Sequence, residues 1–407
     1  MKNVPDLRFF NFKEPWKLTT LGDVSESLSY GMNAAATEYD GVNKYIRITD
    51  IDEKTHRYNP ENIVSPLGEL SDEYLVGEND ILFARTGAST GKTYLYSSDD
   101  GKLYYAGFLI KAHIKSNVDA KFVFYQTQRE IYKNWVKVMS MRSGQPGINS
   151  SEYATFSFLI PSLKEQQKIS AFFSLIDKKI EKQREKVEAL QLYKKGMLQK
   201  VYSQKIRFKD DDGQEFPNWK YDTLGKFANK ITKKNKNGKI TNVISNSAKE
   251  GLIAQRDYFD KDIANIDNID GYYVLEQGDF VYNPRKSTDA PYGPINKYLF
   301  KDKGVVSPLY LCFKVSKSID SDFLAYYFKS DRWYRFIYEN SDQGARHDRV
   351  SIKDSDFFKM TIPIPEIKEQ QKIANFFRTL DKKIQSEQTK LNTLTEWKKG
   401  LLQKMFV

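Results

Sequence analysis

A stretch of 44 residues occurs twice in this chain of 407 residues. Residues 160–203 align without a gap on residues 364–407, at an offset of 204, and 22 of the 44 aligned positions are identical. Both copies contain the hexapeptide KEQQKI. Further upstream, WKLTTLG at Trp16 matches WKYDTLG at Trp219, at an offset of 203. A repeat this long and this widely spaced indicates a tandem duplication of a unit of about 200 residues, and not a short-period solenoid.

Apolar residues recur within each copy at the 3.5-residue spacing of a coiled-coil seam. Of ten successive seam positions, eight are apolar in both copies, and the two polar positions coincide: Gln183 and Lys194 in the first copy, Glu387 and Lys398 in the second. We therefore predict two long helices that pack on each other, against the alternative of two unrelated amphipathic helices on separate cores. The apolar seam residues of these two helices are Ile169, Phe173, Ile176, Ile180, Val187, Leu190, Ile373, Phe377, Leu380, Ile384, Leu391 and Leu394.

The length of these helices predicts how they pair. About 38 helical residues span roughly 57 Å, whereas a segment of about 160 residues folds to a radius of gyration near 15 Å. Such a segment connects antiparallel helices compactly but would have to carry the chain back along a parallel pair. We predict an α+β fold with two similar globular domains separated by a pair of long antiparallel coiled-coil helices, related by a pseudo-two-fold axis. The predicted segments are a first globular domain at 1–162, a central spacer helix at 163–203, a second globular domain at 204–364 and a C-terminal spacer helix at 365–407.

The composition excludes several classes of protein. The single cysteine, Cys312, rules out a disulfide framework and a thiolate zinc site, and the three histidines lack ligand spacing. No apolar run of about 18 residues is present, so we expect a cytoplasmic protein without a membrane span. Of the net charge of +11, residues 164–200 and residues 368–407 carry +5 each.

Two similar domains at a fixed separation suit duplex DNA, whose half-sites recur along an axis. Loops rich in Gly, Ser, Thr, Arg and Gln occupy corresponding places in the two halves, at residues 84–96, 141–153, 282–294 and 340–354. Arginines suit bidentate contacts to guanine, glutamines suit adenine, and further cations suit phosphates; the alternative is ordinary solvated loops. The candidate DNA-binding residues are Arg85, Thr86, Ser89, Lys92, Arg142, Ser143, Gln145, Asn149, Arg285, Lys286, Ser287, Gln343, Arg346, His347 and Arg349.

Two of these loops imitate catalytic motifs without completing them. TGASTGKT at residues 86–93 lacks the first glycine of a phosphate-binding P-loop, and YNPRK at residues 282–286 lacks the second proline and the aromatic residue of an amino-methyltransferase motif. We therefore predict a chain without catalytic residues.

The combined pattern resembles the specificity subunit of bacterial type I restriction-modification enzymes over essentially the whole chain. The resemblance lies in the openings at Trp16 and Trp219, YIRITDID at residues 45–52, the strands NDILFAR and GDFVYNPR, SGQPGINSSEY before the first long helix, and the two repeated helices. It implies a subunit that reads a bipartite, asymmetric site in double-stranded DNA and directs N6-adenine methylation and restriction by its partners. It also implies that residues 1–162 and 204–364 are target recognition domains, and that the two long helices with the seam residues above are spacer and partner-docking helices. The implied partners are two copies of a methyltransferase subunit and two of a restriction/translocase subunit. S-adenosylmethionine, ATP and Mg would belong to those partners, and none to this chain.

Two other functions remain open from the residues alone. One is a stand-alone DNA-binding or scaffold protein that needs no enzyme partner. The other is a chain that is itself a nuclease or methyltransferase, which the missing motifs disfavour.

Overall fold

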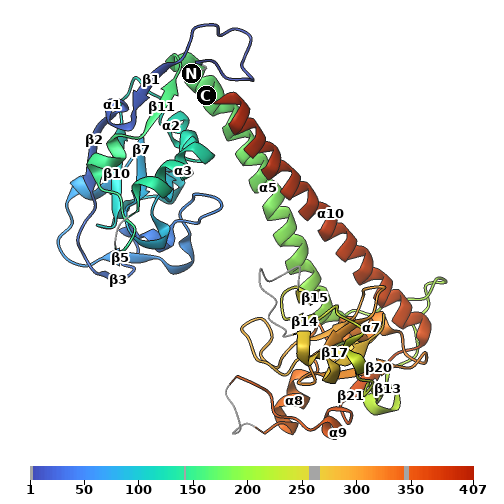
Figure 1. The fold of residues 1–407 in the computed structure, drawn as a ribbon. Coiled ribbons are helices and arrows are strands. Elements are labelled where there is room, and N and C mark those ends of the chain that lie inside the picture. The colour runs from blue at the N-terminus through green and yellow to red at the C-terminus, as the bar shows by residue number, and fades with distance from the viewer. Residues whose placement is uncertain (1–2, 142–143, 256–265, 343–347) are drawn as a thin grey trace. The chain divides into compact units, whose positions relative to one another are not determined.

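The computed structural model describes residues 3–141, 144–255, 266–342 and 348–407. The chain forms two compact units (Figure 1). Unit 1 comprises Met1–Arg184 and Thr389–Val407, and unit 2 comprises Glu185–Gln388. Both long helices, α5 (Leu163–Tyr202) and α10 (Ile367–Met405), therefore contribute to both units.

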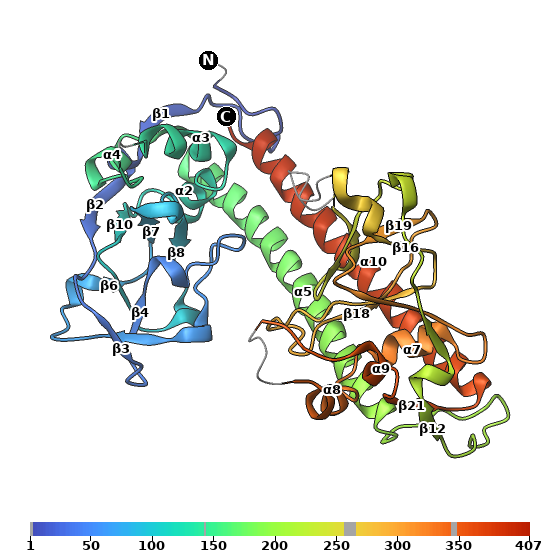
Figure 2. The same cartoon turned by 60° about the horizontal axis from the view of Figure 1, so that its bottom comes forward.

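Each unit has a central four-stranded sheet, and the two sheets have the same topology. Figure 2 labels the strands of the unit 1 sheet. In unit 1 the strand order is β2 (Ser25–Tyr30), β10 (Leu109–Ile114), β7 (Asp80–Ala84), β8 (Thr93–Leu95). In unit 2 it is β13 (Ala228–Lys230), β20 (Leu311–Val315), β17 (Phe280–Tyr282), β18 (Ile295–Lys297). All neighbouring strands in both sheets are antiparallel. The shared order confirms the duplication predicted from the repeat.

The central strands are apolar on both faces because both faces are covered. All five residues of β7, DILFA, are buried, as expected for a strand inside a layered domain. Ile81 and Phe83 face a core that includes α2 (Ala120–Gln126) and α3 (Glu130–Met139). Leu82 and Ala84 face a second core against the small sheet β4 (Lys44–Ile46), β9 (Leu103–Tyr105), β6 (Leu75–Val76). Unit 1 thus has helices on one face of its central sheet and a smaller sheet on the other.

Unit 2 repeats these layers. Phe280 and Tyr282 face the core formed with α7 (Ser321–Tyr327) and α8 (Tyr334–Asn340). Val281 and Cys312 face the opposite core, which contains residues of the two-stranded sheets β14 (Ile244–Ser247) with β15 (Gly251–Ala254) and β16 (Tyr273–Leu275) with β19 (Gly304–Val306). The α+β prediction is confirmed in both units.

The remaining α-helices and strands in the described residues are short. In unit 1 they are α1 (Leu21–Val24), α4 (Ser150–Ala154) and the strand pairs β1 (Lys17–Thr20) with β11 (Ser157–Ile160) and β3 (Ala36–Glu38) with β5 (Val64–Pro66). In unit 2 they are α9 (Asp354–Phe357) and the pair β12 (Lys220–Thr223) with β21 (Thr361–Ile364). Because β11 and β21 lead directly into the long helices, these two pairs connect the start of each duplicated segment to the start of its helix.

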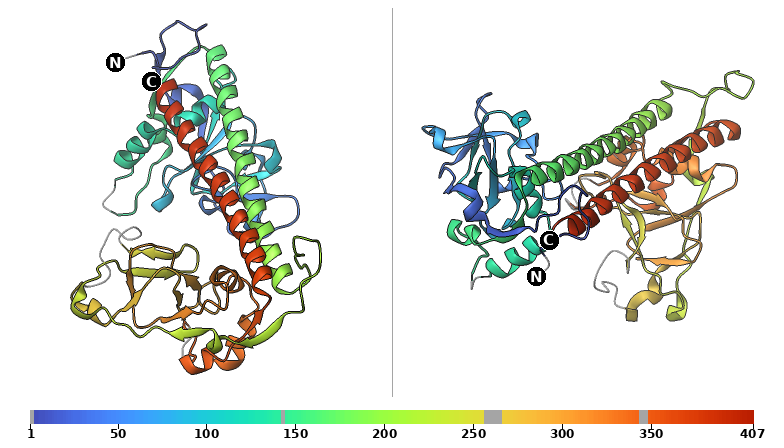
Figure 3. Two further views of the ribbon diagram at one scale, coloured as in Figure 1. Left: turned by 90° about the vertical axis from the view of Figure 1, so that its right-hand side faces the viewer. Right: turned by 90° about the horizontal axis from the view of Figure 1, so that it is seen from above.

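Within each unit, the two long helices pack antiparallel (Figure 3). In unit 1, Ile169 and Phe173 near the start of α5 share a core with Leu402 and Met405 near the end of α10. In unit 2, the start of α10 shares a core with the end of α5 in the same manner. All twelve seam residues predicted from the sequence are buried or half-buried. The predicted antiparallel pairing is confirmed in each unit.

The repeated hexapeptide owes its composition to buried polar contacts. In unit 1 the Glu165 carboxylate is 1% exposed and accepts two hydrogen bonds from Arg8, with Nε–Oε1 and Nη2–Oε2 distances of 2.7 and 2.8 Å. Gln166 accepts from the Asp119 backbone N–H and donates to the Pro161 carbonyl.

Unit 2 makes the same contacts with the second copy. Glu369, 0% exposed, pairs with Arg207 at 3.2 and 2.9 Å, and Gln370 bonds Asp320 and Pro365. A buried carboxylate and a buried amide each need hydrogen-bonding partners. The dipeptide Glu-Gln therefore recurs in the second copy, where the same hydrogen-bonding partners recur around it.

Candidate nucleic-acid interface

In unit 1, two loops that are far apart in sequence lie side by side at one end of the central sheet. The loop after β7 and the loop before α4 exchange backbone hydrogen bonds, from Gly87 N–H to the Pro146 carbonyl and from Ile148 N–H to the Arg85 carbonyl, both at 2.9 Å. Gly87 has φ +71°, and a Cβ at this position would lie 3.0 Å from the Gln145 amide nitrogen. The positive φ favours glycine at this turn, because residues with a Cβ rarely adopt it, while the exposed Gln145 side chain could move away. We call residues 85–92 and 144–149 the paired loops of unit 1.

Arg85 is held in a fixed orientation by its surroundings. Its guanidinium lies 4.7 Å from the centre of the Tyr30 ring, and its Nη1 donates to the Gly107 carbonyl at 3.3 Å. Among the described residues, the buried Arg85 Nε has no hydrogen-bond partner. The Tyr30 hydroxyl in turn accepts from Ser150 N–H at 3.2 Å, and hydrogen bonding from Ser150, with a smaller contribution from the Arg85 charge, lowers the pKa of Tyr30. The sequence offered no signal for Tyr30, which lies far upstream of Arg85.

The other described candidates of unit 1 differ in exposure and in role. Thr86, Ser89 and Lys92 are half-buried in the paired loops, whereas Gln145 is exposed. Asn149 caps α4, because its side chain accepts from Glu152 N–H at 2.9 Å while the Glu152 carboxylate accepts from Asn149 N–H. The side-chain oxygen of Asn149 therefore has a structural role.

Unit 2 forms paired loops with the same backbone pattern. Lys286 N–H donates to the Asp348 carbonyl at 2.9 Å, and Val350 N–H donates to the Pro284 carbonyl at 2.8 Å. Arg285 lies opposite Arg349 in this pairing, as Thr86 lies opposite Gly147 in unit 1. We call residues 284–293 and 348–353 the paired loops of unit 2.

The register shows which residues correspond. Pro284 occupies the place of Arg85, and Arg285 occupies the place of Thr86. Arg285 and Ser287 are exposed, and Lys286 and Arg349 are half-buried. The two units therefore present different side chains from the same backbone arrangement.

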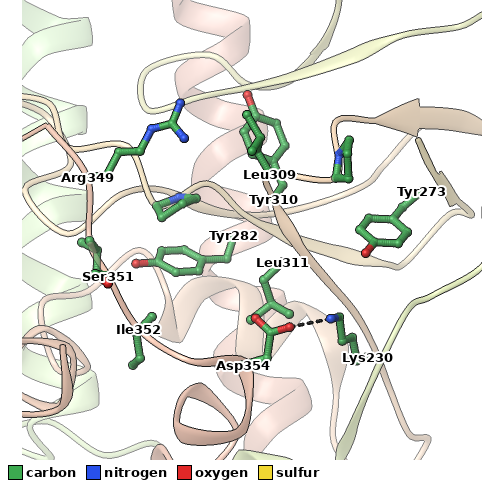
Figure 4. Close-up of a pocket in the computed structure, with 13 residues that line it drawn as sticks. Lys230, Tyr273, Tyr282, Leu309, Tyr310, Leu311, Arg349, Ser351, Ile352 and Asp354 are labelled. Atoms are coloured by element: carbon green, nitrogen blue, oxygen red, sulfur yellow. Dashed lines mark hydrogen bonds and ion pairs between the residues drawn. The ribbon is translucent and has the colours of Figure 1, made fainter. Parts of the chain in front are cut away.

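A pocket of about 350 Å³ borders the paired loops of unit 2 (Figure 4). Arg349, Leu309 and Tyr310 line one part of it, and burial raises the pKa of Tyr310. Elsewhere in its lining, the Lys230 ammonium lies 2.5 Å from the Asp354 carboxylate, and this hydrogen bond raises the pKa of Lys230. The cationic and aromatic groups around the pocket can contact phosphates and bases.

Five candidate residues, Arg142, Ser143, Gln343, Arg346 and His347, lie outside the described residues. In the part of the chain that the structure does describe, no group of three or more His, Cys, Asp or Glu side chains is placed to hold a metal ion. None of the helices in that part combines the length and the hydropathy that crossing a membrane requires.

The family model of the type I restriction modification DNA specificity domain matches the chain twice, at residues 13–190 and 218–396. The chain belongs to this family. Each match covers one of the two duplicated segments, so the specificity domain occurs once per unit. Proteins of this family are the non-catalytic specificity subunits of type I systems. Residues 86–92 of the P-loop-like stretch belong to the paired loops of unit 1, and Thr93 begins β8.

Individual members of the family show the same full-length correspondence. The chain is 22% identical over 422 residues to the type I restriction enzyme MjaVIII specificity subunit of Methanocaldococcus jannaschii, covering 98% of this chain and 94% of that protein. The S subunit of the type I restriction-modification system from M. genitalium superposes with a TM-score of 0.54 at 15% identity, covering 99% of both chains. A chain from a structure of complex assembly and conformational transition in the type I R-M system superposes with a TM-score of 0.56 at 16% identity, covering 97% and 98% of the two chains. These likenesses support the two-domain fold of the specificity subunit.

Proposed function

We propose that this specificity subunit reads a bipartite, asymmetric site in double-stranded DNA, with one half-site for each unit. The observation that carries the proposal is the pair of loops repeated in both units with one backbone pattern and different side chains. Arg85, Gln145 and Thr86 offer one set of hydrogen-bonding groups, and Arg285 and Ser287 offer another. Since sequence is read by side chains at base edges, two such sets favour two different half-sites.

We further propose how the predicted segments divide this work. Residues 1–162 and 204–364 are the target-reading domains, and residues 163–203 and 365–407 are the spacer helices. The proposed DNA-contacting residues are the candidate residues of the paired loops other than Asn149, whose side-chain oxygen caps α4, together with Arg142, Ser143, Gln343, Arg346 and His347. Lys92, Lys286 and Arg349 contact phosphates, which position the protein without specifying sequence.

The proposed partners are those of a type I system: two methyltransferase subunits and two restriction/translocase subunits. Those subunits would bind S-adenosylmethionine, ATP and Mg and would methylate adenine at N6, in the cytoplasm. The seam residues are turned inward, so docking would use the outer faces of α5 and α10, where Leu175, Leu192 and Trp397 are 68%, 69% and 49% exposed.

Methylome sequencing of the native host tests the proposal. Deleting the gene should erase N6-methyladenine at one motif made of two specified parts and an unspecified gap, and a plasmid copy should restore it. A purified wild-type chain should also carry a methyltransferase protein with it. An unchanged methylome and a chain that purifies without such a partner would favour a stand-alone DNA-binding or scaffold protein.

A further inference from the structure

Two charged clusters interrupt the apolar seam between α5 and α10. Cluster 1, in unit 1, consists of Tyr125, Asp177 and Lys398: the Lys398 ammonium lies 2.7 Å from Asp177 Oδ1, and the Tyr125 hydroxyl donates to Asp177 Oδ2 at 2.8 Å. The same ammonium lies 5.3 Å from the centre of the Tyr125 ring and donates to Gln128. Burial raises the pKa of Tyr125, so its hydroxyl keeps the proton that it donates.

Cluster 2, in unit 2, has the same three residue types. The Lys194 ammonium lies 2.5 Å from Asp381 Oδ1, and the Tyr326 hydroxyl donates to Asp381 Oδ2 at 2.8 Å. Lys194 also lies 5.6 Å from the centre of the Tyr326 ring. Burial again raises the pKa of the tyrosine. In both clusters a lysine of one long helix meets an aspartate of the other, and the tyrosine comes from the helix that covers the central sheet.

The two clusters specify the same register of α5 against α10. Asp177 and Lys194 are separated along α5 by the same number of positions as Asp381 and Lys398 along α10. At the rise of an α-helix both spacings are roughly 25 Å. One register therefore satisfies both ion pairs at once.

A different register would separate the charges from their partners. The smallest shift that keeps the apolar seam is one heptad, and it would place Lys398 opposite Ser170 or Arg184. Lys194 would likewise face a residue without a carboxylate. Lys194 and Lys398 are only 22% and 16% exposed, so water would compensate little for the lost carboxylates. Polar groups at seam positions are a known means of specifying helix register.

We propose that clusters 1 and 2 fix the axial register of α5 against α10 and thereby set the number of unspecified base pairs between the two half-sites. The inference rests on the proposed function, because only a subunit that reads two half-sites has a gap to set. The charged residues of the two clusters are then positioning residues that touch no DNA: Lys194, Asp381, Lys398 and Asp177. They select, among targets with identical half-sites, those with the matching gap length.

The test compares gap selectivity in the complete methyltransferase complex. Once the methylome has given the wild-type motif, three duplexes are prepared with the natural gap and with one base pair removed or added, and methyl transfer from labelled S-adenosylmethionine is measured. We expect the variant Lys194→Met with Lys398→Met to lose about tenfold or more of its preference for the natural gap, as removal of charge-assisted hydrogen bonds predicts, while both half-sites stay the same. The control is Lys195→Met with Lys399→Met, which removes the same charge one residue along each helix at exposed positions and should keep the wild-type preference.

A charge exchange keeps the test decisive if the methionine variant does not fold. Lys194→Asp alone should relax gap selectivity, and adding Asp381→Lys should restore it, which a general loss of stability would not do. Unchanged selectivity in the folded methionine variant, or no restoration by the exchange, would overturn the inference. The wild-type complex distinguishes failure of the proposed function from failure of the register inference. If the wild-type complex methylates no split motif, or methylates all three gap lengths equally, the proposed function fails. If the wild-type complex and the methionine variant both prefer the natural gap to the same extent, only the register inference is refuted.

Discussion

At the scale of single residues, the two units carry different side chains on paired loops that share one backbone pattern. Arg85 and Pro284 occupy the same place in the paired loops, but only the arginine has a guanidinium, which lies over Tyr30 and bonds Gly107. A planar guanidinium held in this way can present its outer nitrogens to a base without a further loss of side-chain freedom. The fixed orientation makes Arg85 the candidate reader in unit 1 with the best structural support.

Replacing Arg85 with lysine should distinguish the effect of the side-chain charge on DNA binding from the effect of the guanidinium geometry. The variant keeps the positive charge but lacks the fork that contacts guanine O6 and N7 together. We expect unchanged salt dependence of DNA binding and a loss of about 1–3 kcal/mol of discrimination at one base position. Competition binding with duplexes that vary one position at a time measures both quantities. Lys121→Ala, at an exposed cation of α2 outside the paired loops, should leave discrimination intact; a wild-type profile for Arg85→Lys would exclude Arg85 as a reader.

The buried pair of Arg8 and Glu165 should be necessary for the stability of unit 1. Glu165→Gln leaves the Arg8 guanidinium, 10% exposed, without its counter-charge, and breaking a buried pair in this way costs about 3 kcal/mol or more. Hydrogen exchange should show protection in unit 1 falling by about a hundredfold. Glu369→Gln should have the same effect confined to unit 2. Equal loss of protection in both units from either change would show that the pairs do not act locally.

Cys312 should be inert in the native protein. Its side chain is 0% exposed, and burial raises the pKa of its thiol to about 12. At pH 8 only about one thiol in ten thousand would be ionised, and the thiolate is the reactive form. We expect Ellman's reagent to react only as unit 2 unfolds, and to detect one thiol per chain in denaturant. Complete labelling of the native protein within minutes would contradict this placement.

At the scale of elements, the sequence predicted α5 and α10 well because their seam is a local periodic signal. The positions of both polar interruptions were also visible in the sequence. The partners of Lys194 and Lys398 were not, because Tyr326 and Tyr125 come from α7 and α2, far away along the chain. The same limit applied to the paired loops: their compositions stood out, but the correspondence of Arg285 with Thr86 depends on hydrogen bonds between segments that are distant in the sequence.

Lengthening both helices together should lengthen the gap in the DNA site. Inserting one heptad after Gln183 and one after Glu387, at equivalent positions between the two clusters, extends each helix equally and keeps both ion pairs. The added rise of roughly 10.5 Å corresponds to about three base pairs. Three base pairs also turn the duplex by roughly 100°, so we expect weaker binding than wild type. Methylome sequencing reads the new gap directly.

Insertion into one helix alone is the control for this design. The spacing of Asp177 and Lys194 would no longer match that of Asp381 and Lys398, so both ion pairs could not form in a single register. We expect the single insertion to abolish gap selectivity or methylation. A gap that is unchanged by the double insertion would show that the helices do not set it.

At the scale of the whole molecule, the duplication accounts for features that a single copy would leave unexplained. The strand orders, the paired loops, the buried Glu and Gln of the hexapeptide and the seam clusters all occur twice. The side chains at the paired loops differ between the two units. Divergence there, with a preserved framework around it, is what reading two different half-sites requires.

The exchange of one target-reading domain tests the central claim most directly. Residues 1–162 are replaced by the corresponding segment of a family member with a different methylation motif, and the methylome of a host carrying the hybrid is sequenced. We predict a motif in which one half-site is new while the other half-site and the gap are those of the wild type. A motif changed in both halves, or in neither, would contradict the assignment of one half-site to each unit.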